Sequence, residues 1–346
     1  MKQHIKDFLT STQPFRFVGK SVRNIFFPYV LQRVEPSELF VELTSICNAE
    51  CVFCNYRFGH RAKQKIPLEK FENIIKSAYD MGYRRLNLTS MGGELFVHDK
   101  AIEAIETARD IGYEIIETYT NGILLNKLDI KRLLHSGITA LKISFPGFDR
   151  QIYKDVYGVD RFMDFDLSLK SLLREHKELD SEVKVVLEPR SSLSMKELMD
   201  SEYYQANIAS YIKDIVYMNK PIVRYDTWGG EISSDMLPSG MKTEINPLKR
   251  LLPNSKVHLC NMMQNFGVLA NGDIRICNCR YDASIEKDDS LYIDNVFKYD
   301  SLRSAIEANK EKISRIRREF MDGKLPKLCQ NCTFYLPIKI LDEESL

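Results

Sequence analysis

Between residues 38 and 227 the sequence alternates short apolar runs with amphipathic helical patterns. The runs are rich in β-branched residues and have the length of buried β-strands. They cover residues 39–44, 85–90, 113–120, 140–145, 183–188 and 221–226. Strands that alternate with helices predict a parallel β/α architecture. A complete eight-stranded barrel usually needs ~250 residues, and this stretch has only about 190. We therefore expect an α/β fold, a partial (β/α)6 TIM-like barrel.

Three of the helical patterns carry start or stop signals. Residues 67–82 begin with Pro67, which favours the first turn of a helix, and end at Gly82. Residues 99–112 and 126–137 also end in glycine, the residue that most often terminates a helix. These signals place helices between the first four predicted strands.

The composition limits the classes of partner. The 346 residues include 49 basic and 48 acidic side chains, a formal net charge of +1. This balance gives no reason to expect binding to nucleic acid. No run approaches the ~18 apolar residues of a membrane span, and the N-terminus lacks the apolar core of a signal peptide. We expect a cytoplasmic protein with no stable membrane association.

The remaining segments suggest the domain organisation. Residues 1–37 are aromatic and mildly basic, and we expect them to cap the open side of the barrel domain, residues 38–227. A helix lying on a membrane surface is the alternative for the first segment. Residues 228–259 are rich in Gly, Pro and Ser, which predicts a linker that also shapes the mouth of the site. Residues 260–346 form a smaller C-terminal domain.

Eight cysteines fall into two groups, and in a cytoplasmic chain they fit metal ligands better than disulfides. The first group has the spacing Cys47-x3-Cys51-x2-Cys54 on one predicted loop. Thiolates are soft ligands that suit an iron–sulfur cluster or zinc. A closed site uses four protein ligands, so three leave one metal position open for a reactive ligand. A zinc knuckle with His60 as its fourth ligand is the alternative.

The sequence around these cysteines, ELTSICNAECVFCNY, resembles the cluster loop of the radical S-adenosylmethionine (radical SAM) superfamily. The resemblance includes the Asn after the first cysteine and the aromatic Phe53 before the third, which we count among the cofactor-binding residues. It implies a [4Fe–4S] cluster whose open iron is chelated by the methionine part of S-adenosylmethionine (SAM). It also implies cleavage of SAM to a 5′-deoxyadenosyl radical.

A second motif follows the second predicted strand. In barrels of this type functional groups lie at the C-terminal ends of strands. Gly92-Gly93-Glu94 occupies that place and resembles the GGE motif that holds the amino group of SAM, although Leu95 stands where the family usually has Pro. Two glycines allow close approach of the backbone to a ligand. An ordinary turn is the alternative.

Single residues at the ends of later strands match the family more loosely. Asn121, in a Thr-Asn-Gly segment, and Ser144 resemble residues near the cofactor ribose. Glu188 and Arg190 follow the fifth strand, and an arginine there can clamp the cofactor carboxylate bidentately. Arg224 and Asp226, at the end of the sixth predicted strand, are candidate acid–base residues. A plain Asn-Gly turn is the alternative for Asn121, and exposure on the surface is the alternative for Glu188 and Arg190.

The second cysteine group resembles the Twitch extension of some radical SAM enzymes, in which four cysteines hold an auxiliary [4Fe–4S] cluster. A hairpin with its turn at Asn271-Gly272 and a helix precede the closing Cys-x2-Cys pair. The resemblance makes Cys260, Cys277, Cys329 and Cys332 the ligands. Structural zinc suits four thiolates equally well. Cys279 is left over as an alternative ligand, a bystander or a hydrogen-atom donor.

By resemblance to Twitch enzymes of the aminocyclitol-dehydrogenase type, we expect an oxidoreductase. It would remove hydrogen from a small carbohydrate-like or aminocyclitol substrate and oxidise an alcohol, with the auxiliary cluster as electron acceptor. Arg190 or Arg224 would influence the hydroxyl proton, and a flavodoxin- or ferredoxin-type protein would be the reductant. An epimerase that uses Cys279, a peptide-modifying maturase and a non-enzymatic zinc or iron–sulfur scaffold are the alternatives.

Overall fold

The computed structural model describes residues 30–32, 38–58, 62–244, 257–277, 290–330, 332, 335 and 337–340. Its centre is a row of six parallel strands, each hydrogen-bonded to the next in chain order. They are β2 (Leu39–Val41), β3 (Arg85–Asn87), β4 (Ile115–Thr120), β5 (Ala140–Phe145), β6 (Lys184–Pro189) and β7 (Val216–Met218). This arrangement confirms the predicted α/β fold with a partial barrel.

Helices connect successive strands, and their ends match the predicted signals. They are α3 (Leu68–Asp80), α4 (Ala101–Ile111), α5 (Ile130–His135), α6 (Arg150–Tyr157), α7 (Phe162–Glu178), α8 (Met195–Asp200) and α9 (Glu202–Asn207). Pro67 is the N-cap of α3, and Gly112 caps α4 in the left-handed conformation with φ +109°. Asp129 caps α5 because its side chain accepts a hydrogen bond from the Arg132 amide.

The prediction of the sixth strand was wrong. The strand that pairs with β6 is β7, in which Val216 lies opposite Val185. The predicted run 221–226 instead contains β8 (Arg224–Tyr225), which pairs in parallel with β9 (Lys242–Thr243) in a separate two-stranded sheet. That run begins with Pro221, and proline has no amide hydrogen to donate to a ladder inside a sheet.

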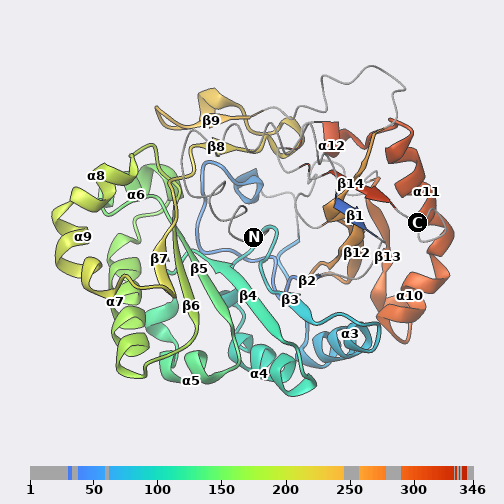
Figure 1. Cartoon of the computed structure of the whole chain (residues 1–346), viewed down its shortest axis with the longest axis horizontal. Helices are drawn as coiled ribbons and strands as arrows, with labels where there is room; N and C mark the ends of the chain where they lie inside the picture. The colour runs from blue at the N-terminus through green and yellow to red at the C-terminus, as the bar shows by residue number, and fades with distance from the viewer. Residues whose placement is uncertain are drawn as a thin grey trace, which may run out of the picture.

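The C-terminal half continues the barrel sheet. Strand β11 (Phe266–Val268) pairs in parallel with β2, and β12 (Asp273–Ile276) and β13 (Tyr292–Asn295) follow as antiparallel neighbours. The predicted hairpin turn is confirmed, with Gly272 at φ +88°. Helices α10 (Leu302–Ala308) and α11 (Lys310–Met321) lie on the side of the molecule away from α7–α9 (Figure 1).

A small third sheet joins distant parts of the chain. Strand β1 (Val30–Gln32) pairs in parallel with β14 (Pro337–Ile340), and β10 (Leu259–Cys260) pairs with β14 in antiparallel orientation. The other described residues begin at Glu38, so the rest of the predicted capping segment 1–37 lies outside them. No helix in the described ranges combines the length and apolar character needed to cross a membrane.

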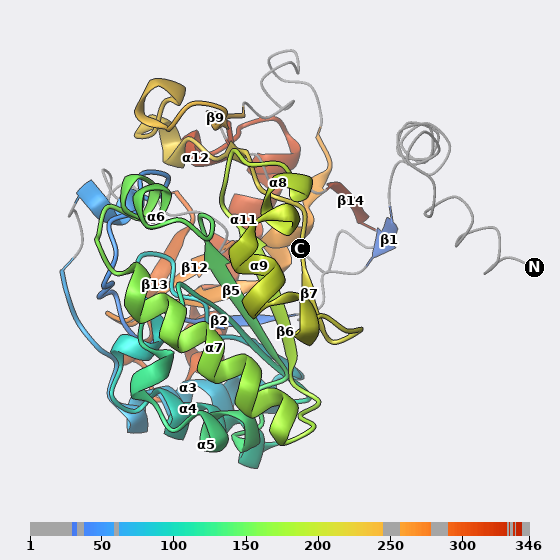
Figure 2. The same ribbon diagram turned by 90° about the vertical axis from the view of Figure 1, so that its left-hand side faces the viewer.

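The faces of the strands alternate between the helices and the barrel interior. On β5 the ring of Phe145 stacks on Phe165 of α7 with their centroids 5.7 Å apart. Because side chains alternate along a strand, Lys142 and Ser144 point to the opposite face, the interior. Figure 2 shows α6, β9 and α12 (Lys327–Gln330) at one end of the molecule and α3, α4 and α5 at the other. Because α6 follows β5, the first of these is the C-terminal end of the parallel strands.

Candidate cofactor and cluster sites

The first three cysteines lie on the loop that follows β2, and their partly buried thiols form no disulfide. Burial and the charge of Glu94 raise the pKa of the Cys47 thiol to about 12. Burial and the neighbouring thiols Cys54 and Cys47 raise the pKa of Cys51 well above its usual value. Three thiols that oppose each other's ionisation need a positive centre to become thiolates, and bound metal ions supply such a centre.

The backbone of this loop is fixed by the end of α6. The amides of Glu50 and Val52 donate to the carbonyl oxygens of Tyr157 and Val156, each over 2.9 Å. Gly158 ends the helix at φ +69°, and a Cβ there would lie 2.6 Å from the Glu50 carbonyl oxygen. Only glycine fits this close approach. Backbone hydrogen bonds to the end of α6 therefore help to hold the loop in place.

The Gly92-Gly93-Glu94 segment packs directly against the start of the cysteine loop. The Glu94 amide donates to the Ile46 carbonyl oxygen over 2.9 Å. A Cβ on Gly93 would lie 2.1 Å from the Thr44 carbonyl oxygen, so no other residue fits without moving the backbone. The two segments that the sequence analysis assigned to one cofactor site thus lie side by side.

The Glu94 carboxylate is 4% exposed and joins the loops that follow β3 and β4. Its Oε1 accepts hydrogen bonds from Thr120 Oγ1 over 2.7 Å and from the Phe96 amide over 3.4 Å. Its Oε2 accepts one from the Asn121 amide over 2.9 Å. Burial raises the pKa of Glu94, and these hydrogen bonds oppose the rise. The carboxylate therefore holds the two loops together through these hydrogen bonds, and it also places a negative charge next to the cysteine loop.

Asn121 reaches the cysteine loop through its side chain. Its Nδ2 donates to Asn48 Oδ1 over 2.7 Å and lies 4.0 Å from Cys47 Sγ. Gly122 follows at φ +73°, which turns the chain sharply after the amide. The Thr-Asn-Gly segment therefore contacts the first cysteine, a role that a plain surface turn would not have.

Ser144, Glu188 and Arg190 form one hydrogen-bonded group at the C-terminal ends of β5 and β6. Arg190 Nε donates to Ser144 Oγ over 3.2 Å, and its Nη2 lies 3.4 Å from Glu188 Oε2. Glu188 Oε1 accepts hydrogen bonds from Tyr119 over 3.1 Å and from Asn219 over 3.0 Å. The sequence analysis missed Tyr119 and Asn219. The alternation along β4 offers a signal for Tyr119, because it shares a face with inward-pointing positions.

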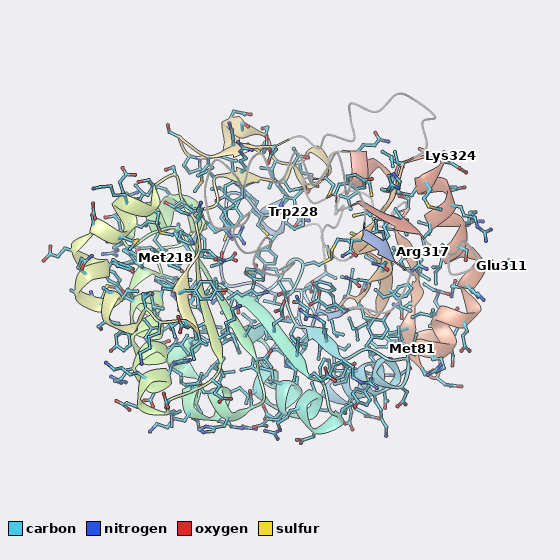
Figure 3. All side chains as sticks on the ribbon, in the orientation of Figure 1. Met81, Met218, Trp228, Glu311, Arg317 and Lys324 are labelled. Carbon is cyan, nitrogen blue, oxygen red and sulfur yellow. The ribbon has the colours of Figure 1, made fainter. Side chains whose placement is uncertain are left out.

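Phe53 is enclosed by aromatic and cationic groups. Its ring stacks on that of Tyr225 with centroids 4.9 Å apart, and the Arg190 guanidinium carbon lies 6.0 Å from its centroid. Trp228 Nε1 donates to the Phe53 carbonyl oxygen over 2.9 Å. The Trp228 backbone has φ +47°, a strained conformation for a bulky residue. In Figure 3 Trp228 lies near the middle of the view, between Met218 on one side and Arg317 on the other.

Arg224 does not join this group. Its side chain is 57% exposed and forms an ion pair with Glu244 over 2.8 Å. The correction of the sixth strand explains the difference, because Arg224 lies on β8 outside the barrel sheet. Asp226, two residues after Arg224, is buried, and its Oδ1 accepts a hydrogen bond from the Trp228 amide over 2.7 Å. We therefore assign Arg224 no part in the site.

The second group of cysteines is assembled from separate elements. Cys260 ends β10, Cys277 follows β12, and Cys329 lies in α12 ahead of Cys332. Burial and the charges of Cys277, Cys332 and Cys260 raise the pKa of the Cys329 thiol well above its usual value. The four thiols therefore lie close enough to act on one another. Cys279 and His60 lie outside the described residues.

Within the described part of the chain, no three or more His, Cys, Asp or Glu side chains are arranged to hold a single metal ion. A tetrahedral zinc site requires its ligands to converge on one point. A [4Fe–4S] cluster places its thiolates on different irons, so its cysteines surround a larger volume.

Two buried polar atoms without a partner test whether the first site fits a cofactor. Ser90 Oγ, immediately before Met91 and the two glycines, and Asn48 Nδ2, beside Cys47, are buried with no hydrogen-bond partner. Buried polar groups in proteins are rarely left unsatisfied. Both atoms belong to the segments that hold Glu94 and the cysteine loop. The residues present therefore fit a polar ligand seated between these segments.

Comparison with known proteins agrees with this geometry. A model of the radical SAM superfamily matches residues 41–187, the segment that contains the cysteine loop and the strands through β6. Residues 41–187 are therefore similar to the radical SAM domain. This family holds a [4Fe–4S] cluster and binds SAM, as the cysteine loop predicted.

Curated relatives of the radical SAM domain include probable GTP 3′,8-cyclases. The protein from Sulfurisphaera tokodaii is 30% identical over 123 residues, which cover 36% of this chain and 38% of that protein. The protein from Methanothermobacter marburgensis is 30% identical over 122 residues, which cover 35% and 39%. The matched segment thus spans about two fifths of the relatives' length.

Solved structures extend the likeness beyond the radical SAM domain. BtrN in complex with AdoMet and 2-DOIA has a TM-score of 0.51 and 14% identity, covering 90% of this chain and 97% of that one. Streptococcus suis SuiB bound to the precursor peptide SuiA has a TM-score of 0.56 and 16% identity, covering 93% and 78%. At these identities the likeness establishes a shared fold.

Proposed function

We propose that this chain is a radical SAM enzyme of the Twitch type that oxidises an alcohol of a small carbohydrate-like or aminocyclitol substrate. When bound, SAM and the two clusters would supply a 5′-deoxyadenosyl radical that removes one hydrogen atom and an acceptor for the remaining electron. The observation that carries the proposal is the presence of two separate thiol groups, one of three cysteines on the loop after β2 and one of four on elements of the C-terminal half. A flavodoxin- or ferredoxin-type protein is the proposed reductant.

In this proposal the first site holds the cluster through Cys47, Cys51 and Cys54. Gly92, Gly93 and Glu94 hold the amino end of SAM, because their backbone lies directly against the cysteine loop. The further cofactor-binding residues are those that reach the same loop or the adjoining strand ends, namely Phe53, Asn121, Ser144, Glu188 and Arg190. The two unsatisfied polar atoms in these segments support a polar ligand here.

The polar group on β5 and β6 is suited to a hydroxyl-bearing substrate. Arginine stays protonated, so Arg190 cannot accept the proton that an alcohol loses on oxidation. Glu188, bonded to Arg190, Tyr119 and Asn219, is a carboxylate that can accept it. We therefore assign Arg190 the role of holding Glu188 in place.

We propose that the second site holds an auxiliary cluster, as the resemblance of its cysteine spacing to the Twitch extension implies. Burial and the charges of Cys277, Cys332 and Cys260 raise the pKa of the Cys329 thiol, so a bound metal centre would favour its thiolate form. In the proposed reaction Glu188 would accept the hydroxyl proton. SAM bound at the first cluster would supply the acceptor for one hydrogen atom, and a cluster held by the four cysteines of the second site would supply the acceptor for the remaining electron, so that the alcohol becomes a carbonyl.

The proposal is tested with anaerobically purified full-length protein. We expect about eight irons per chain, the content of two [4Fe–4S] clusters, and release of 5′-deoxyadenosine when the protein is reduced with dithionite in the presence of SAM. With an amino-polyol substrate the product should be two mass units lighter. Colourless, zinc-loaded protein that releases no 5′-deoxyadenosine would contradict the enzyme proposal.

The same assay in D2O separates oxidation from epimerisation. An epimerase returns a hydrogen to the carbon, so its product would carry one non-exchangeable deuterium from an exchangeable thiol. We expect no such label, and we expect Cys279→Ala to retain most activity. A labelled isomer formed by the native protein and absent with Cys279→Ala would replace the dehydrogenase proposal with an epimerase.

A further inference from the structure

The two carboxylate oxygens of Glu188 lie in unequal surroundings. Oε1 accepts two hydrogen bonds, from Tyr119 Oη over 3.1 Å and from Asn219 Nδ2 over 3.0 Å. Within the described part of the chain Oε2 has one polar contact, with Arg190 Nη2 over the longer distance of 3.4 Å. Each oxygen of an ionised carboxylate offers about two lone pairs. Oε1 is therefore fully occupied, whereas Oε2 can accept from a further donor.

The Tyr119 side chain is held at its ring as well as at its hydroxyl group. The Lys142 ammonium lies 5.0 Å from the ring centroid, and the Arg190 guanidinium carbon lies 6.0 Å from it. Lys142 is held in turn by Glu117, whose Oε1 lies 2.7 Å from the ammonium. The Tyr119 amide donates to Thr89 Oγ1 over 2.9 Å. Because the ring has cation–π contacts and the backbone is bonded, the hydroxyl group stays directed at Glu188.

The other two partners of Glu188 are anchored as well. The Asn219 amide donates to the carbonyl oxygen of Leu187, the residue before Glu188, over 2.8 Å. Arg190 Nε donates to Ser144 Oγ over 3.2 Å. Glu188 is 7% exposed, so water has little access to replace these partners. The orientation of the carboxylate is therefore set by the protein.

We propose that Tyr119 and Asn219 occupy Oε1 of Glu188 and thereby make Oε2 the oxygen that accepts the hydroxyl proton of the substrate. This inference rests on the proposed alcohol oxidation. In that step the substrate O–H bond breaks, its proton forms an O–H bond with Oε2, and the bonding electron pair stays on the substrate oxygen. Tyr119 and Asn219 are positioning residues, because they act through Glu188 and not on the substrate.

The first experiment compares Tyr119→Phe with native holoprotein, with scyllo-inosamine as the aminocyclitol probe. Phenylalanine keeps the ring next to Lys142 and removes only the hydroxyl group. We expect kcat for the oxidised product to fall roughly tenfold, a part of the about 10²–10⁴-fold that a general base contributes. KM for the probe and release of 5′-deoxyadenosine should not change. D2O should slow product formation more than it does for native protein, because proton transfer becomes the slow step.

Two further comparisons separate positioning from a general structural effect. Tyr203→Phe is the matched control, because the Tyr203 hydroxyl donates to the Asp166 carboxylate between helices α9 and α7, outside the site. It should leave kcat unchanged. Glu188→Gln should lose nearly all product formation, and adding Tyr119→Phe to it should cause no further decrease, since residues that act as one unit are not additive.

An infrared difference spectrum tests the same contact without a substrate. Native protein minus Glu188→Gln isolates the carboxylate band of Glu188. Tyr119→Phe and Asn219→Leu should each shift that band, because each removes one donor to Oε1. Tyr203→Phe should leave the band unchanged.

An unchanged kcat in Tyr119→Phe, a decrease no larger than in Tyr203→Phe, or a rise in KM alone would overturn the inference. If Tyr119→Phe fails to retain its iron, Asn219→Leu decides the question through the same measurements, because it removes the second donor to the same oxygen. Native protein that releases 5′-deoxyadenosine but forms no oxidised product would instead contradict the proposed function. The infrared band would then decide whether Tyr119 holds Glu188, so the two failures are distinguishable.

Discussion

The two cysteine sites of this chain are built in opposite ways. Cys47, Cys51 and Cys54 lie on one loop of eight residues, and backbone hydrogen bonds to the end of α6 fix that loop. The second site combines Cys260, Cys277 and the pair in and after α12, which lie on separate elements. A local site needs one loop geometry, whereas a distributed site exists only after distant segments have packed together. The first is therefore expected to tolerate changes elsewhere in the chain better than the second.

Charged groups near the two sites act on their thiols in different ways. At the first site the charge of Glu94 raises the pKa of Cys47, whereas Arg190 lowers that of Cys51. At the second site the charge of Arg275 lowers the pKa of Cys329. At both sites burial is the largest cause and raises the pKa of the thiols.

The largest effect should come from removing the local site. Replacing Cys47, Cys51 and Cys54 together by Ala should abolish SAM cleavage, because no protein ligand remains for the open-site cluster. Iron content should fall by about four per chain, one [4Fe–4S] cluster. The measurements are iron analysis and chromatography of 5′-deoxyadenosine. Residual cleavage at the native rate would show that SAM is activated elsewhere.

Removing the distributed site should have a different signature. Cys329→Ser with Cys332→Ser should also lose about four irons and most substrate turnover. Uncoupled SAM cleavage should survive, since the cysteine loop is fixed by α6 and not by α12. Full iron and full product yield in this variant would mean that the second site holds no auxiliary cluster.

Glu94→Gln tests the carboxylate beside the local site. A charge-assisted hydrogen bond contributes about 1.5–3 kcal/mol, so SAM affinity should fall at least roughly tenfold. Gln keeps only one acceptor oxygen, so it can retain the hydrogen bond from the Asn121 amide, while Thr120 Oγ1 can accept one from the new NH2 group. Equilibrium binding of SAM measures the effect, and an unchanged dissociation constant would make the segment an ordinary turn.

The pH dependence of the same binding has a defined sign. Burial raises the pKa of Glu94, so its ionised form is lost earlier than for an exposed glutamate as the pH falls. Native SAM affinity should therefore decrease as the pH falls through the raised pKa, above the usual value for glutamate. Folding stability has the opposite trend, because burial favours the neutral carboxyl and stability declines as the pH rises through the same range. Glu94→Gln should show neither change.

The smallest effect is expected from Asn121→Ala. The amide Nδ2 lies 4.0 Å from Cys47 Sγ, a weak contact, and donates more strongly to Asn48. Hydrogen bonds to cluster sulfurs influence reduction potentials, so the open-site cluster should become slightly harder to reduce while the auxiliary potential stays unchanged. A redox titration of holoprotein with dithionite, followed by electron paramagnetic resonance of each cluster, measures both midpoint potentials. A larger shift at the auxiliary cluster would contradict the separation of the two sites.

The sequence by itself determined the parts of this protein that depend on neighbouring residues. The cysteine loop, the glycine-rich segment, the helix ends and the hairpin turn at Gly272 were predictable, because each is specified within about ten residues by spacing, capping or a left-handed turn. The first five barrel strands were predictable for the same reason, since their apolar runs are continuous.

Only the tertiary structure decided which distant groups meet. It placed β7 at 216–218 and moved Arg224 to an exposed two-stranded sheet, because pairing with β6 outweighs the apolar pattern of the later run. It also joined β11 to β2, bonded Tyr119 and Asn219 to Glu188, and placed Arg275 beside Met91. Such contacts depend on chain packing over long sequence separations, and no local spacing encodes them.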